Sequence, residues 1–435
     1  MKRLLLIILL IFLSAGCKNS LPQPAVISGE SSHAQTTIVF WNENAAADRT
    51  QYYKELIARF EKENPDIHVE YVGLPKKAAR LKINTAIATN ELPDVCGVQS
   101  AWIAEFYNKG VLLKLDNWFE NWDGKDDIIG SVIAANRRLA PDGGLYQLPN
   151  TMGMEILWYR QDWFKQAGIE PPSDWDSFFI ATEKLTDTAK GHYGYALRGG
   201  DGAAIQLLRA MFAYSGETQF FANDGHCVIR DPQYIAFVKR YLGMYRECTA
   251  ISDITNGYQE MVAEFDSGQA AIMQHNLGSY GSHQRSLSED QFKALLLPRS
   301  LKGTIVQEAN NVDGYGIFNT TKHPEAAWRF VSFLCSPEIQ SWWNERIGQM
   351  PVSHKALSDE LVNNKEHMRL TRQALASDKM RFYMPPMYLP NYRKIVDGTD
   401  TDIEQALMGN MAVEDLLAKW ADKFEQANRD YQQKK

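Results

Sequence analysis

The sequence is poor in cysteine and lacks the concentrated positive charge of nucleic-acid-binding proteins. Its 435 residues include five cysteines and no C-x-x-C pair, so neither a disulfide framework nor a structural zinc site is indicated. The 46 basic and 53 acidic residues give a formal net charge of −7, and no dense Lys/Arg run is present. These absences argue against a small disulfide-stapled scaffold and against nucleic acid as a partner.

Sequence patterns of common enzyme classes are also missing. The chain contains no G-x-S-x-G, H-E-x-x-H or G-K-[ST] pattern. A glycoside hydrolase is the enzyme alternative that remains, because such an enzyme requires only two carboxylates across a cleft. No segment places an isolated acid within a hydrophobic run, as a carboxyl group with a raised pKa would need. We therefore predict a protein that is not an enzyme, with no cofactor and no metal.

What the chain does have is an ample supply of apolar residues, at 45% hydrophobic and 11% aromatic. This composition excludes disorder as the main state. A length of 435 residues suggests two or three domains at about 150 residues each.

The N-terminus has the form of an export signal. Two basic residues precede the ten apolar residues 4–13, and small residues follow before Cys17. The apolar run is shorter than the roughly 20 residues that a helix needs to cross a bilayer. Residues 13–17, LSAGC, resemble a bacterial lipobox, although Ser14 stands where most lipoboxes have a large aliphatic residue. We expect residues 1–16 to be a signal peptide and Cys17 to be lipidated, with a free cysteine after ordinary cleavage as the alternative.

Residues 17–36 are rich in Ser, Pro, Gln and Ala and show no periodicity. Such a composition is typical of a flexible tether. We therefore expect a protein anchored by its N-terminal lipid to a bacterial envelope membrane, facing the periplasm or the cell exterior.

Strand and helix patterns alternate after the tether. Residues 37–41 and 92–98 are β-rich, residues 67–71 alternate between apolar and polar, and residues 52–60 and 78–89 have helical spacing. Repetition of strand, helix and strand predicts an α/β fold with mostly parallel sheets. Ligands of such sheets bind beyond the carboxyl ends of the strands.

Polar and aromatic residues follow the first and third predicted strands. Asn42 and Glu43 come after the first, and Gln99 and Trp102 come after the third. Their position makes these four residues candidates for ligand contact.

Helix ends and a possible disulfide can also be predicted farther along the chain. Gly168 is expected to end one helix, and Ser173 or Asp174 to cap the next at its N-terminus. Cys227 and Cys248 could form a disulfide in an oxidising compartment, with two free thiols as the alternative.

Five blocks of sequence, in order along the chain, resemble the extracellular solute-binding proteins of ABC importers, in the family that includes maltose-type sugar binders. Two positions depart from the usual family pattern, namely Arg160-Gln161 and Tyr280. The blocks are residues 92–95 with 109–116, residues 146–149 with 158–160, residues 164–169 with 171–175, residues 265–273, and residues 322–328 with 333–338.

The resemblance implies a type II periplasmic-binding-protein fold with two α/β lobes joined by a hinge. Lobe 1 is expected to comprise residues 37–148 and 312–356, and lobe 2 residues 149–311 and 357–435. A ligand would bind in the cleft, and the lobes would close on it without chemistry.

The resemblance also implies a function. We expect a monomeric, substrate-binding lipoprotein of an ABC transporter that captures a carbohydrate, in particular an oligosaccharide, and delivers it to the permease subunits. Alternatives are a non-sugar solute such as a phosphorylated polyol, which a cluster of Arg in the cleft would favour, and a sensory binding protein that signals to a histidine kinase.

Sugar sites combine aromatic faces with fixed amides, carboxylates and hydroxyls. To the four residues above we therefore add Asn150, which follows the first crossing, and Asp201 in a glycine-rich loop. Tyr280 is added because it aligns with an aromatic position of the family. His275 is a further candidate to line the cleft, with a solvent-facing position as the alternative.

Overall fold

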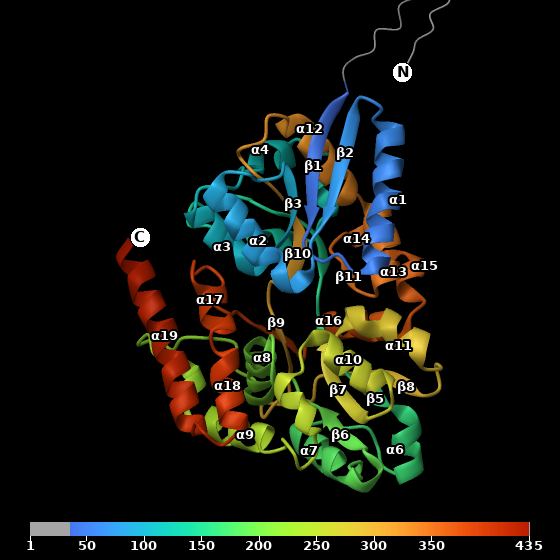
Figure 1. Ribbon diagram of the computed structural model, residues 1–435, viewed down its shortest axis with the longest axis vertical. Helices are drawn as coiled ribbons and strands as arrows, with labels where there is room; N and C mark the ends of the chain where they lie inside the picture. The colour runs from blue at the N-terminus through green and yellow to red at the C-terminus, as the bar shows by residue number, and fades with distance from the viewer. Residues whose placement is uncertain (1–34, 435) are drawn as a thin grey trace, which may run out of the picture.

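Two β-sheets, each covered by helices, form two lobes stacked along the long axis of the molecule (Figure 1). The computed structural model describes residues 35–434. The expected signal peptide, the lipidation site at Cys17 and nearly all of the tether lie outside these residues. The two-lobed α/β architecture is the one that the sequence predicts.

The first lobe contains a six-stranded sheet with the order β11-β4-β10-β3-β1-β2. Strand β1 pairs in parallel with β2 and β3, whereas β10 pairs antiparallel with β3 and β4, and β11 antiparallel with β4. The sheet is thus mixed, and the prediction of a mostly parallel sheet is wrong here, because β10 enters between β3 and β4 when the chain returns from the second lobe. The strands are β1 (Thr36–Asn42), β2 (Ile67–Gly73), β3 (Val95–Gln99), β4 (Leu148–Met152), β10 (Val312–Ile317) and β11 (Met350–Pro351).

The second lobe contains a four-stranded sheet with the order β6-β7-β5-β8. Only β6 and β7 pair in parallel, because β5 runs antiparallel to both of its neighbours. A separate parallel pair is formed by β9 (Ile305–Glu308) and β12 (Met380–Tyr383). The strands of the main sheet are β5 (Glu155–Arg160), β6 (Tyr193–Ala196), β7 (Ala270–Asn276) and β8 (Phe292–Leu296).

Helix α1 (Ala47–Glu63) shows how the apolar spacing directs packing. Tyr53, Leu56, Ile57 and Phe60 form its buried face, at the i, i+3, i+4, i+7 positions expected of an amphipathic helix. A hydrophobic cluster with strands β1 and β2 receives this face.

The predicted helix caps at Gly168 and Asp174 are formed. Gly168 ends α6 (Gln161–Ala167) with a left-handed φ of 62°. Asp174 accepts a hydrogen bond from the backbone N–H of Ser177, whose side chain accepts one in return from the backbone of Asp174. This reciprocal pair starts α7 (Trp175–Lys184).

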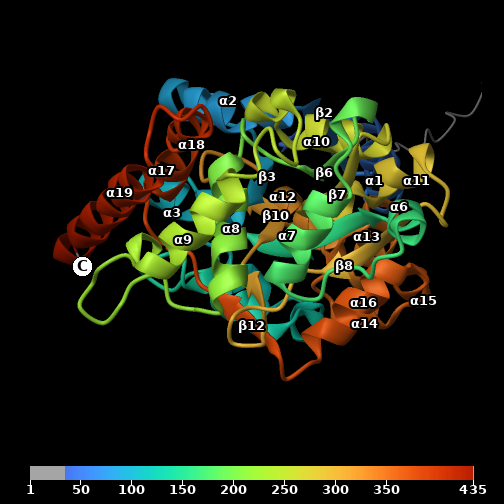
Figure 2. The same cartoon turned by 90° about the horizontal axis from the view of Figure 1, so that it is seen from below.

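The C-terminal helices connect the two lobes on one side (Figure 1, Figure 2). Helix α17 (Tyr392–Asp397) contacts both α8 (Ala203–Ser215) of the second lobe and α3 (Ser100–Asn108) of the first. Arg80 of the first lobe strengthens the contact, with Nη2 at 2.7 Å from Asp397. One hydrophobic cluster therefore includes residues of both lobes. The remaining C-terminal helices are α18 (Asp400–Leu407) and α19 (Val413–Lys434).

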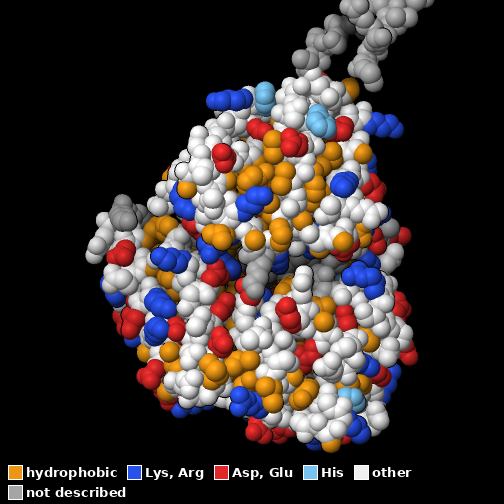
Figure 3. Space-filling view, in the orientation of Figure 1, with side chains coloured by type: hydrophobic (Ala, Val, Ile, Leu, Met, Phe, Trp, Pro, Cys, Tyr) orange, Lys and Arg blue, Asp and Glu red, His pale blue; other side chains and the backbone are white. Residues whose placement is uncertain are grey.

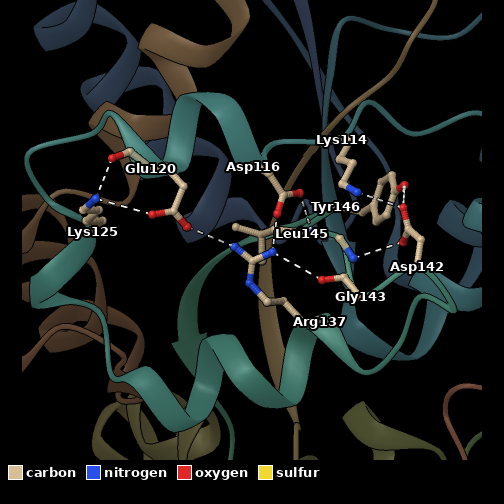
Figure 4. A network of polar contacts seen from close by, with 10 residues as sticks. Lys114, Asp116, Glu120, Lys125, Arg137, Asp142, Gly143, Leu145 and Tyr146 are labelled. Carbon is tan, nitrogen blue, oxygen red and sulfur yellow. Dashed lines mark hydrogen bonds and ion pairs between the residues drawn. The ribbon is translucent and has the colours of Figure 1, made fainter.

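The segment that leads into β4 is fixed by a polar network (Figure 4). The guanidinium of Arg137 pairs with Asp116, whose other oxygen accepts a hydrogen bond from the Leu145 N–H at 2.9 Å. Asp142 accepts hydrogen bonds from Lys114 at 3.1 Å and from Tyr146 at 2.9 Å. This network holds the turn before β4, the strand from which the chain crosses to the second lobe.

Cys227 and Cys248 are free, buried thiols, so the possible disulfide between them is not formed. Their surroundings differ, because Cys248 lies beside Thr186 and Thr182, whereas Cys227 lies beside Glu425 and Arg230.

The helices and the side-chain clusters of residues 35–434 bear on membrane insertion and on metal binding. None of the helices there is long and apolar enough to span a membrane. No group of three or more His, Cys, Asp or Glu side chains in that range could hold a metal ion.

Candidate ligand-binding cleft

A crevice separates the two lobes across the middle of the molecule (Figure 3). At its base on the first lobe is a small cavity formed by the loop after β1, helix α1, β4, β10 and α13 (Pro337–Ile347). The residues that line it are Glu43, Arg49, Tyr53, Asn150, Thr151, Asp313, Gly314, Tyr315 and Trp343.

Glu43 is the most unusual group of this cavity. It is 7% exposed, and its Oε2 atom has no hydrogen-bond partner. The carboxylate lies against Gly97 of β3 so closely that a Cβ at residue 97 would be 1.7 Å from Oε2. Burial, followed by repulsion from Asp313, raises the pKa of Glu43 to about 7. A buried carboxyl group with a free oxygen can accept hydrogen bonds from a ligand.

Replacing Gly97 by alanine should force the Glu43 carboxylate to move. We expect G97A to lower the free energy of unfolding by about 1–3 kcal/mol, as measured by urea denaturation, because the added methyl group overpacks this position. The exposed Gly130 provides the control, since a Cβ there meets nothing within 4 Å. G130A should change stability by less than about 1 kcal/mol or stabilise the helix. In the G97A/E43A double variant the loss should be largely relieved; a loss of the same size with and without Glu43 would show that the carboxylate does not lie against β3.

Charged side chains from the first lobe surround this carboxylate. Asp313 of β10 and Arg49 of α1 line the same cavity. Lys76 begins α2 (Lys76–Thr89) and extends across the cleft, where its Nζ atom lies 4.7 Å from the centroid of the Tyr258 ring in the second lobe. Lys76 thus brings the first lobe into contact with the second.

The second lobe contributes Arg198, Tyr258 and His275. Arg198 follows β6, Tyr258 begins α10 (Tyr258–Asp266), and His275 belongs to β7. The ring centroids of His275 and Tyr258 lie 4.0 Å apart. Burial and then the charge of Arg198 hold the pKa of His275 well below its ordinary value, so the imidazole is neutral.

Several buried polar atoms near His275 lack partners. Both ring nitrogens of His275 and both side-chain polar atoms of Gln274 are unpaired, as is Oε1 of Gln206. Gln206 of α8 donates its amide hydrogen to the Gln274 carbonyl at 2.8 Å, so these residues are adjacent. Because unpaired buried polar groups are costly, they mark a place where water or a ligand supplies hydrogen bonds.

The structure brings some of the predicted site residues to the cleft. Glu43 and Asn150 line the small cavity, and Asn150 retains a free Oδ1 while its amide nitrogen donates to Leu334 O at 2.7 Å. Gln99 pairs in register with Asp313 at the end of β3. Asp201 is exposed, and its backbone carbonyl accepts a hydrogen bond from Arg198 Nε.

Three other predicted residues are engaged in packing or local hydrogen bonds. The Asn42 amide donates to the Tyr71 hydroxyl at 3.0 Å. Trp102 is 4% exposed within the hydrophobic cluster that spans the lobes. Tyr280 stacks on His367 with ring centroids 4.2 Å apart. The ligand-binding roles of all seven predicted residues stay predictions.

His275 is buried on a strand, so the alternative of a solvent-facing position is wrong. Arg49, Lys76, Arg198, Tyr258 and Asp313 were not predicted from the sequence. The Gly199-Gly200 pair indicates a loop directly after Arg198. The other four residues have no local pattern that distinguishes them from surface or core residues.

The model for bacterial extracellular solute-binding proteins matches residues 46–341. The chain belongs to this family. The family consists of solute-binding proteins and not of enzymes, which confirms the prediction that the chain is not an enzyme.

Individual relatives agree with this assignment. A putative binding protein of Brucella abortus (strain 2308) is 25% identical over 367 residues, covering 82% of this chain and 85% of its own length. The multiple sugar-binding protein of Streptococcus mutans is 27% identical over 347 residues, covering 77% of this chain and 79% of its own.

Solved structures share the fold. An ABC substrate-binding protein of Listeria monocytogenes, in complex with cycloalternan, superposes with a TM-score of 0.78 at 20% identity, over 90% of this chain and 98% of that one. The predicted periplasmic-binding-protein fold is thereby confirmed.

Proposed function

We propose that this protein is the substrate-binding subunit of an ABC transporter that captures a carbohydrate, in particular an oligosaccharide, between its lobes. The observation that carries the proposal is a cleft lined from both lobes by unpaired carboxyl, amide and imidazole groups beside aromatic rings. Such a combination suits hydroxyl-rich ligands with apolar faces. The S. mutans relative is named a multiple sugar-binding protein, and the Listeria protein is in complex with cycloalternan. Both support a carbohydrate as the ligand.

Lobe closure is the proposed means of capture. The lobes expected at residues 37–148 with 312–356 and at residues 149–311 with 357–435 would move relative to one another about the crossings that follow β4 and β9, with residues 149–152 moving with the first lobe because they belong to β4 of its sheet. Glu43, Asp313 and Asn150 would hold one side of the ligand, and Arg198, Tyr258 and His275 the other. Gln99, Asp201, Asn42, Trp102 and Tyr280 remain further proposed contacts.

Delivery to the permease completes the proposal. An acylated Cys17 would anchor the protein to the membrane, with residues 17–36 as the tether. The closed, ligand-bound monomer would then present both lobes to the transmembrane subunits.

A thermal-shift screen over a carbohydrate library tests the proposal. A ligand present at 100 times its dissociation constant should stabilise the folded state by about 2.7 kcal/mol. At saturation, small-angle scattering should show a smaller radius of gyration, and chromatography should recover the ligand unchanged.

Glu43→Ala is the cleft variant for this test, and Glu70→Gln on the exposed face of β2 is its control. E43A should weaken binding by at least tenfold, whereas E70Q should bind as the wild type does. If no carbohydrate stabilises the protein, or if product accumulates, the proposed function is wrong.

A further inference from the structure

Three cationic side chains face the cleft without an acidic partner. Arg49, Lys76 and Arg198 come from α1, from α2 and from the loop after β6. Among residues 35–434, no carboxylate oxygen lies within 4.0 Å of any of the three side-chain cations. The nearby Arg209 is different, because it is bound by two carboxylates. Attraction to carboxylates reaches these cations only from farther away, from Asp313 for Lys76 and from Asp201 for Arg198. The cleft therefore contains three cations that make no direct ion pair with the described residues.

Arg198 is held in a fixed orientation. Its Nε atom donates a hydrogen bond to the Asp201 carbonyl at 2.6 Å. Its guanidinium packs against Gly202, where φ is 82° and a Cβ would lie 2.3 Å from Nη2. No hydrogen bond from either Nη atom to another described residue is present, so the end of the guanidinium is free to donate two hydrogen bonds to one planar anion.

Lys76 and Arg198 lie on opposite lobes. Lys76 rests on the Tyr258 ring, where Asp313 attracts its charge and Arg49 and Arg198 repel it. When the lobes approach one another, these like charges are brought together in a partly desolvated cleft, which opposes closure. An anion bound between Lys76 and Arg198 would attract both cations, so the electrostatic energy would then favour closure of the lobes.

The acids of the cleft lie on both of its sides. Glu43 and Asp313 line the first-lobe cavity together with Arg49. Asp201 is exposed beside Arg198, but its carboxylate makes no ion pair with the guanidinium within 4.0 Å. Glu43, Asp313 and the unpaired groups of Gln274 and His275 therefore remain for hydroxyls, and the ends of Arg198 and Lys76 remain for an anion.

Resting on the proposed function, we propose that the carbohydrate is acidic and that the carboxylate of a uronic acid residue binds between Arg198 and Lys76. Arg198 donates to both carboxylate oxygens, and Lys76 contributes a point charge from the other lobe. Glu43 and Asp313 accept hydrogen bonds from the sugar hydroxyls. The anion thus determines both which sugar binds and how readily the lobes close.

The test compares uronate oligosaccharides of galacturonic, glucuronic and mannuronic acid with their methyl esters, which keep every hydroxyl and lose the charge. Calorimetry should show at least tenfold tighter binding of one free acid than of its ester, and this preference should shrink as salt is added. R198Q and K76Q should each reduce the preference to threefold or less. The control R240Q, which removes a cation from the outer surface of the second lobe, should retain it.

Each other outcome contradicts the inference. Equal binding of acid and ester, or a preference that persists in both R198Q and K76Q with their folded structure intact by circular dichroism, would show that the cations do not select an anion. Binding of neutral oligosaccharides alone would overturn this inference and leave the proposed function standing. A lack of binding to any carbohydrate, acidic or neutral, would overturn both.

Discussion

Replacing Arg209 by methionine should lower the free energy of unfolding by about 3–5 kcal/mol at pH 7.5. Arg209 on α8 pairs with Glu155 at the start of β5, at 2.7 Å, and with Glu308 at the end of β9. The two carboxylates are only 6% and 2% exposed in their side chains. Methionine keeps much of the arginine stem but leaves both charges buried and unpaired. Urea denaturation followed by circular dichroism measures the loss.

The pH dependence of R209M has a defined sign. Burial already raises the pKa of Glu308, and removal of Arg209 should raise it further because the positive charge lowered it. A carboxyl group with a raised folded-state pKa is penalised above that pKa and relieved below it. The deficit of R209M should therefore shrink as the pH falls toward 5.

A matched control separates this effect from a general cost of losing an arginine. Arg240 on α9 (Pro232–Leu242) pairs with Asp176, which is 83% exposed. R240M should lose no more than about 1 kcal/mol, because an exposed pair contributes little. Equal losses in the two variants would contradict the structural role assigned to Arg209.

The second large effect is on the pH dependence of stability, and it concerns the buried carboxyl groups of Asp253 and Glu264. The side-chain amide of Asn256 donates to Asp253 at 2.8 Å and to Glu264 at 3.0 Å, and Asp253 also accepts from the Leu197 N–H at 2.7 Å. Burial, followed by the charge of Asp253, raises the pKa of Glu264 to about 9. The folded pair therefore keeps a proton at neutral pH.

This proton makes stability fall as the pH rises. Between the unfolded pKa of 4.5 and the folded pKa of about 9, the native state holds a proton that the unfolded chain releases. The free energy of unfolding should then decrease by about 1.4 kcal/mol per pH unit from this group alone. Glu264→Gln cannot ionise, so its stability should decline less steeply and should exceed that of the wild type at pH 8.5.

Unfolding midpoints between pH 5 and 9 test the expectation for E264Q. Glu247→Gln, an exposed substitution in the same lobe, is the control and should follow the wild-type pH profile. Parallel profiles for E264Q and the wild type would show that Glu264 is ionised in the folded protein at neutral pH.

Local patterns predicted the elements well, because apolar spacing and caps depend on neighbours in sequence. The strand before Asn42 and the helix that buries Phe60 follow from such spacing, and Glu43 was found because it follows a strand end. Trp102 shows the limit of that reasoning. It shares a buried helix face with Ile103 and Phe106, a helical spacing that indicated core packing as much as a ligand contact.

The rest of the cleft depends on contacts distant in sequence. Asp313 meets Gln99 only because β10 enters the first sheet beside β3. Lys76 meets Tyr258 only because the lobes face one another. The sequence also did not predict the raised pKa of Glu264. Its segment is amphipathic, and the pKa depends on burial and on the charge of Asp253, which precedes it by 11 residues.

The placement of β10 has a consequence for the order in which the protein can fold during synthesis. Strands β3 and β4 flank β10, so their inner edges stay unpaired until residue 317 has been made. The register joins Gln99 to Asp313 and Thr151 to Pro351, which are contacts of high sequence separation. Such contacts make folding slow, since long loops must close before the sheet is complete. The first 150 residues can pair β1 with β2 and β3, but β4 can join them only after β10 has been made, so the first sheet is completed only late in translation.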